Sequence, residues 1–167
     1  WLAEEIACAE EAGADWIHVD VMDGHFVPAL TIGPLVTESV RRATSLPVDV
    51  HLMIEQPDRH LEAFAGAGAS IATVHQETCP HLHRTVERIR ELGVRPGVCV
   101  NPSTSVDTLI EILPYVDLVL VIGAPNSSNC NRLREVAEAS GVTAYLINGP
   151  SELNEAWLED VETIGIT

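Results

Sequence analysis

The chain contains 167 residues, and its 25 acidic side chains outnumber nine basic ones to give a formal net charge of −16. This excess of negative charge repels nucleic acid and anionic membrane surfaces, so we expect neither as a partner. The length suits one compact domain, and the acids recur along segments of helical period, which is typical of a solvated outer face rather than an acidic tail.

Seven apolar, β-rich runs alternate along the chain with segments of helical period. The runs cover residues 16–21, 48–53, 71–75, 97–100, 118–122, 143–147 and 163–166. Apolar residues recur at helical spacing between them, as at Leu82, Val86, Ile89 and Leu92, and at Val106, Leu109, Ile110 and Leu113. This alternation predicts an α/β fold in which about seven parallel strands are joined by right-handed crossovers, with the helices outside the sheet.

The cysteines and the chain start give further expectations. Cys8, Cys79, Cys99 and Cys130 form no C-x-x-C pair, which favours free thiols over disulfides or a zinc site. No apolar run approaches the roughly twenty residues that a bilayer requires, and the start lacks a signal-peptide pattern, so we expect a cytoplasmic protein. The chain enters a helical pattern directly at Trp1, which indicates a fragment at the N-terminus.

Two strand segments carry residues suited to a metal site. They read His18-Val19-Asp20-Val21-Met22-Asp23-Gly24 and Asp49-Val50-His51-Leu52-Met53. Alternate side chains of a strand share a face, so His18 and Asp20 project together, and His51 joins them if the next strand lies alongside in parallel. Two imidazoles and a carboxylate suit a divalent metal ion that could hold a sugar's oxygens and stabilise an enediolate. The competing interpretation is that these histidines are packed strand residues bonded to backbone.

From residue 1 to about 117 the chain resembles ribulose-phosphate 3-epimerase. The matching segments are Ala12-Gly13-Ala14-Asp15, His18 to Pro28, Leu30-Thr31-Ile32-Gly33-Pro34, Val48 to Met53, Gly66-Ala67-Gly68-Ala69-Ser70 and Asn101-Pro102. The resemblance implies a TIM barrel of the ribulose-phosphate-binding type. Here we expect only part of that barrel, which need not close. It also implies a metal-dependent isomerase of the pentose phosphate pathway, which converts D-ribulose 5-phosphate to D-xylulose 5-phosphate by proton transfer at C3.

The resemblance assigns roles to individual residues. Asp20 would be a catalytic acid/base, and it would bind one Zn, Fe, Mn or Co ion together with His18 and His51. His51 would also contact the substrate, as would Met22 and Met53, which would form an apolar wall around the enediolate.

The epimerase resemblance also predicts what this chain lacks. The family's second aspartate and its glycine-rich phosphate loops belong to the part after residue 117, so we expect turnover to be impaired. At the ends of the later strands lie Asn148 and Thr167, whose side chains cannot deliver a proton near neutral pH as a carboxylic acid can. Glu77 could approach the site, although a salt-bridged surface acid is the commoner role. His75 could contact substrate or pack behind the site.

From about residue 118 to 167 the chain is similar to part of 4-hydroxy-3-methylbut-2-enyl diphosphate reductase, a family of isoprenoid synthesis. The similarity rests on Ile122 to Leu133, Ala144-Tyr145-Leu146-Ile147, Glu155 to Glu159 and Gly165-Ile166-Thr167. It implies a βαβαβ fragment packed as a continuation of the same domain, with Ser127, Ser128 and Asn129 at a diphosphate. These three residues could equally be helix caps. No iron-sulfur cluster is expected, because the segments that carry its cysteines are missing.

Three functional hypotheses follow from these patterns. The first is an epimerase-family protein with a metal site and little turnover. The second is a fragment of the diphosphate reductase. The third is a chimera without catalysis that at most binds metal or anions, in which unpaired sheet edges would invite formation of a homo-oligomer. A small phosphorylated sugar is the partner that the first hypothesis requires.

Overall fold

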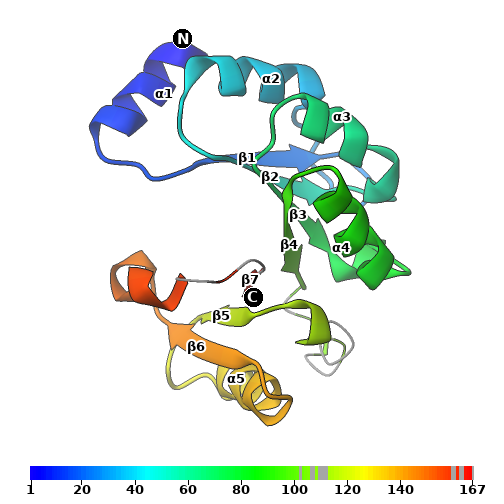
Figure 1. The fold of residues 1–167 in the computed structure, drawn as a ribbon, viewed down its shortest axis with the longest axis vertical. Coiled ribbons are helices and arrows are strands. Elements are labelled where there is room, and N and C mark those ends of the chain that lie inside the picture. Colours follow the sequence, from blue (N-terminus) through cyan, green and yellow to red (C-terminus); the bar gives the residue numbers. More distant parts are fainter. Residues whose placement is uncertain (102, 106–107, 109–112, 159–160, 162–163, 167) are drawn as a thin grey trace. The chain divides into compact units, whose positions relative to one another are not determined.

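The computed structural model describes residues 1–101, 103–105, 108, 113–158, 161 and 164–166. It divides into two compact units, Trp1–Pro96 and Gly97–Thr167 (Figure 1). None of the helices in these described ranges is both long and apolar enough to cross a membrane.

The first unit alternates helices and strands. In chain order it contains α1 (Leu2–Glu11), β1 (Ile17–Met22), α2 (Pro34–Ala43), β2 (Val48–Met53), η1 (Pro57–Arg59), α3 (Leu61–Gly66), β3 (Ile71–His75), η2 (Gln76–Thr78), α4 (Leu82–Glu91) and the start of β4 (Arg95–Cys99). β1 pairs with β2 and β2 with β3, both in parallel.

Strand alternation gives this unit one apolar face and one polar face. The side that packs under the helices carries the buried strand residues Val19, Val21, Val48, Val50, Leu52, Ala72 and Val74. The helices contribute Ile6, Val40, Leu61, Phe64, Val86 and Ile89 to the same core. In Figure 1 α1, α2 and α3 lie on one side of β1 and β2. The alternate strand residues project to the opposite side, where the candidate site lies.

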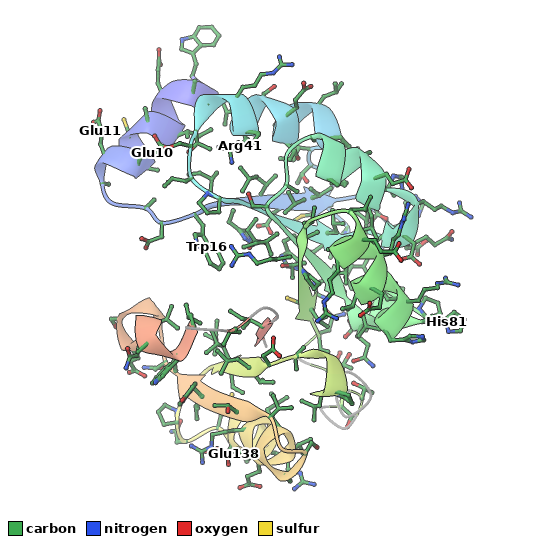
Figure 2. The ribbon with its side chains drawn as sticks, in the orientation of Figure 1. Glu10, Glu11, Trp16, Arg41, His81 and Glu138 are labelled. Carbon is green, nitrogen blue, oxygen red and sulfur yellow. The ribbon has the colours of Figure 1, made fainter. Side chains whose placement is uncertain are left out.

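Polar side chains fix the segment that links α2 to β2. Arg41, near the end of α2, donates to the backbone oxygens of Leu46, at 2.8 Å, and Thr44. Glu10 of α1 accepts from the Thr44 hydroxyl and from the Ser45 backbone N–H. Glu10 and Arg41 are labelled in Figure 2. These bonds satisfy backbone groups at a helix end and tie α1 to the start of β2.

The second unit contains the end of β4, β5 (Leu118–Ile122), α5 (Ser128–Ala139), β6 (Thr143–Ile147) and β7 (Ile164–Ile166), with short helices η4 (Leu113–Tyr115), η5 (Pro150–Glu152) and η6 (Glu155–Leu158). β7 pairs in parallel with both β4 and β5, and β5 pairs with β6. The core includes Leu118, Val119, Leu120, Val121, Leu133, Val136, Ala137, Ala144 and Ile147. Tyr145 and Trp157 stack with ring centres 3.8 Å apart.

The predicted α/β class and its seven parallel strands are confirmed. Within the described residues β1 pairs with β2 alone and β6 with β5 alone, so neither unit is a closed barrel. The helical pattern at 106–113 falls largely on positions outside the described residues, and Leu113 begins η4. The compact units divide after Pro96, whereas the domains predicted from resemblance, 1–117 and 118–167, divide at a boundary that stays a prediction.

Candidate metal centre

The polar face of the first unit is built by the pairing of β1, β2 and β3. His18 is paired with Asp49, Asp20 with His51, and Met22 with Met53. On the next strand Thr73 is paired with His51. Because paired residues of parallel strands point to the same side, the alternation of polar and apolar residues places all of these side chains on one face.

Three side chains predicted to bind metal converge on that face. His18 Nε2 and His51 Nδ1 each lie 3.1 Å from Asp20 Oδ1, and the three donor atoms lie within 4.8 Å of one another. The His18 and Asp20 side chains are about half exposed, whereas that of His51 is 18% exposed. A tetrahedral site with bonds of about 2.0–2.1 Å places its ligand atoms roughly 3.3 Å apart, so this donor set fits a metal ion after small shifts.

Asp49 orients His18 through the ring nitrogen that does not meet Asp20. Its Oδ2 atom lies 2.7 Å from His18 Nδ1, and its Oδ1 atom accepts a hydrogen bond from the Thr73 hydroxyl at 3.2 Å. Asp49 is only 8% exposed. The hydrogen bond to Asp49 raises the pKa of His18 above its ordinary value. No role was predicted for Asp49 from the sequence, although a charged residue between Val48 and Val50 was an available signal.

His51 contacts His75 through its other nitrogen. The two Nε2 atoms lie 2.8 Å apart, and His75 is buried against the ring of Phe26, at 4.9 Å between ring centres. Burial lowers the pKa of His51 and of His75. The attraction of Asp20 for protonated His51 does not overcome this effect. A neutral His51 is the form that can bind a metal ion.

Hydrogen bonds hold the loop after β1 beside these residues. One oxygen of Asp23 accepts hydrogen bonds from the backbone N–H groups of His25 and Phe26, and its second oxygen accepts from Glu55 N–H. The Thr31 hydroxyl donates to the Asp20 carbonyl and accepts from Met22 N–H. The backbone that follows Asp20 is therefore held in place.

The remaining predicted site residues lie elsewhere. Ser127 is the N-cap of α5, where its hydroxyl accepts from Cys130 N–H at 3.4 Å, and Ser128 is exposed on the first turn. The side chain of Asn129 and all of Thr167 lie outside what the structure describes. Ser127 thus makes the capping bond that was one of its two predicted roles, and the diphosphate role stays a prediction.

Comparisons with known proteins identify relatives of the chain. A sequence model described as the ribulose-phosphate 3 epimerase family matches residues 1–136. Proteins named ribulose-phosphate 3-epimerase are 58% identical over 121 residues in Bacillus subtilis and 45% identical over 170 residues in Synechocystis. The chloroplastic enzyme of Arabidopsis thaliana is 51% identical over 123 residues.

The extent of these alignments differs. They cover 72%, 93% and 72% of this chain, and 56%, 74% and 44% of the respective relatives. The chain therefore spans about half the length of the Bacillus and Arabidopsis proteins. Because the Synechocystis alignment covers 93% of the chain, it includes residues after Asp117.

The chain is also similar to two solved structures of the reductase that residues 118–167 resemble. One, of (E)-4-hydroxy-3-methyl-but-2-enyl diphosphate reductase, is 21% identical and covers 99% of this chain and 57% of its own at a TM-score of 0.37. The other, from Plasmodium falciparum, is 15% identical and covers 99% and 51% at the same TM-score. This score is too low to support an argument about fold or function.

Proposed function

Because the chain belongs to the ribulose-phosphate 3-epimerase family, we propose that β1 and β2 bind one divalent metal ion and serve the interconversion of D-ribulose 5-phosphate and D-xylulose 5-phosphate. The observation that carries this proposal is the convergence of His18 Nε2, Asp20 Oδ1 and His51 Nδ1. Two imidazoles and a carboxylate suit Zn, Fe, Mn or Co.

The side chains on this face have complementary tasks. When bound, the ion polarises the substrate's carbonyl and hydroxyl oxygens and stabilises the negative charge of an enediolate. His18 and His51 would hold it with neutral ring nitrogens, and Asp20 with a carboxylate oxygen. Asp20 would also take the proton from C3, since a carboxylate near the reacting carbon is a suitable base. Met22 and Met53, the next pair on the same face of the strands, would shield the enediolate from water.

We infer that turnover by this chain is low, because epimerisation needs a second acid on the opposite side of the reacting carbon. Asp49 and Glu77 carry carboxylates near this face of the first unit, and both already have partners. Asp49 is bonded to His18 and Thr73, and Glu77 lies beside His75. Either carboxylate would have to give up these contacts to return a proton to C3.

The first test is metal binding by the full chain after treatment with a chelator. We expect one equivalent of Co²⁺, detected by its visible absorption, and loss of that binding in Asp20→Asn. Asp15→Asn, which changes an exposed carboxylate outside the site, should bind as the parent does. Equal binding by Asp20→Asn would contradict the metal site.

The second test is epimerisation of D-ribulose 5-phosphate by the metal-loaded chain, with the Bacillus subtilis relative as the reference. We expect a rate at least about 10²-fold lower than that of the reference, the usual contribution of one acid or base. Equal rates would show that another group supplies the second proton.

A further inference from the structure

His51 and His75 are joined end to end through their ring nitrogens. The Nε2 atoms lie 2.8 Å apart, the ring centres lie 5.0 Å apart, and the ring planes differ by 17°. The separation of the centres nearly equals the Nε2 to Nε2 distance plus one ring radius, about 1.1 Å, at each end. The two rings are therefore almost coplanar, so an N–H of one ring points at a lone pair of the other.

The outer nitrogen of each ring lies near a carboxylate, at hydrogen-bond geometry for His51 and at a longer ion-pair distance for His75. His51 Nδ1 lies 3.1 Å from Asp20 Oδ1, and His75 Nδ1 lies 3.5 Å from Glu77 Oε2. His75 is 7% exposed, and the Glu77 side chain is 22% exposed. The first unit thus contains a row of four groups in the order Asp20, His51, His75 and Glu77.

Counting protons along this row distinguishes two arrangements. Two neutral imidazoles carry two ring protons, and one of these must lie between the Nε2 atoms to form their hydrogen bond. The other proton lies either on His51 Nδ1, facing Asp20, or on His75 Nδ1, facing Glu77. A metal ion needs a lone pair on His51 Nδ1, so only the second arrangement is ready to bind it.

We propose that His75 and Glu77 are positioning residues that keep the ring proton of His51 on Nε2 and leave Nδ1 available to a divalent metal ion. The inference rests on the proposed function, since it concerns a ligand of the same site. The Glu77 carboxylate can only accept hydrogen bonds, so it favours a proton on His75 Nδ1. His75 Nε2 then accepts from His51 Nε2–H, in the way that outer-shell partners orient metal-binding histidines.

The test compares Co²⁺ affinity, measured by chelator competition, in full-length variants. In Glu77→Gln the amide can donate to His75 Nδ1 as well as accept from it, so the preference for the metal-ready arrangement is lost. Glu87→Gln is the matched control, because it removes the same charge from the exposed side of α4, where Glu87 pairs with Arg90. His75→Leu removes the acceptor for His51, and His75→Gln restores an acceptor of similar reach.

We expect Kd to rise about 10-fold to 100-fold in His75→Leu, the range found for outer-shell partners, and severalfold in Glu77→Gln. His75→Gln should lie much closer to the parent, and Glu87→Gln should match it. Affinities of Glu77→Gln and His75→Leu within about twofold of the parent would overturn the inference. If His75→Leu does not fold, Glu77→Gln decides, because it replaces a partly exposed side chain with an isosteric one.

A second readout separates this inference from the proposed function. Nitrogen-15 shifts of the His51 ring, recorded on the metal-free chain, report which nitrogen carries the proton. We expect the Nδ1–H form to increase in Glu77→Gln and to stay at the parent level in Glu87→Gln. A parent chain that binds no Co²⁺ would contradict the metal site, while the response of the His51 shifts would still decide the role of Glu77. Unchanged shifts in Glu77→Gln would count against that role.

Discussion

His18 Nδ1 and Asp49 Oδ2 lie 2.7 Å apart at directly paired positions of β1 and β2. This contact leaves His18 Nε2 facing Asp20, whereas His51 presents its Nδ1 to the same carboxylate oxygen. The two histidines therefore use opposite ring nitrogens, and each has its other nitrogen held by a side chain of the neighbouring strand, Asp49 or His75. Such outer contacts fix ring orientation before a metal ion arrives.

Replacing Asp49 by Asn should lower the pKa of His18 toward its ordinary value, because the hydrogen bond and negative charge that favour the protonated ring are lost. NMR titration of the His18 ring in metal-free protein measures this directly. Co²⁺ affinity should also fall, by about 10-fold to 100-fold. Asp58→Asn removes one negative charge at a surface pair with Arg84 and should change neither quantity. The same His18 pKa in both variants would contradict the role assigned to Asp49.

Cys79 should resist alkylation in the folded chain. The thiol is 4% exposed, and burial raises its pKa to about 11, so little of the reactive thiolate forms near neutral pH. Cys8 is exposed and should react with iodoacetamide like an ordinary surface thiol. Peptide mass spectrometry against time should show Cys79 labelled only after denaturant is added. Equal labelling half-times for the two residues would show that the segment around Cys79 opens readily.

The strand pattern contained enough information to predict the convergence of His18, Asp20 and His51. Period-two alternation defines a shared face, and two consecutive strands joined by a helix pair in parallel, so the three positions had one simple arrangement. The partners of these residues were harder to predict. Which ring nitrogen meets Asp49 or His75 depends on side-chain rotamers and on the exact register, neither of which follows from periodicity.

The strand neighbours in the second unit show another limit of the pattern. β7, a strand of three residues, lies between β4 and β5 in the pairing, although β5 follows β4 in the sequence. Strands that are consecutive in sequence are often, but not always, neighbours in a sheet, so composition does not select the order. The predicted ends of β2, β3, β5 and β6 are confirmed, whereas those of β1 and β4 differ by one or two residues, as for β1, predicted at 16–21 and observed at Ile17–Met22.

Gly68→Ala should destabilise the first unit more than Gly13→Ala does. Both glycines have left-handed backbone angles, φ +93° and +91°, so either substitution costs about 1–2 kcal/mol in backbone strain. A Cβ at Gly68 would also lie 2.9 Å from Arg41 Cδ and closer to Cγ, whereas a Cβ at Gly13 meets nothing within 4 Å.

Arg41 cannot move away freely, because its guanidinium is bonded to the backbone oxygens of Leu46 and Thr44. Denaturant unfolding of the two variants measures the difference. Equal losses of stability would show that Arg41 gives way at no cost.

His75 and His18 should respond to acid in opposite directions when no metal is bound. Burial lowers the pKa of His75. Below the ordinary value of 6.5 the unfolded chain therefore takes up a proton that the folded chain resists, and stability falls as the pH falls. The hydrogen bond to Asp49 raises the pKa of His18, so its contribution is complete below 6.5 and is lost as the pH rises through the raised value.

Substitution at each histidine should therefore change the acid sensitivity of the fold with a different sign. The thermal midpoint of each variant is measured in EDTA at about pH 7.5 and at about pH 5.5, which bracket the ordinary histidine pKa. The quantity compared with the parent is the drop in midpoint from the higher pH to the lower. His75→Gln should reduce the drop in midpoint, because the group that resists protonation is gone. His18→Asn should enlarge the drop, because the cation that pairs with Asp49 in acid is gone. A change of the drop in the same direction in both variants would contradict this prediction. Loss of packing, rather than protonation of the two rings, would then explain the acid response.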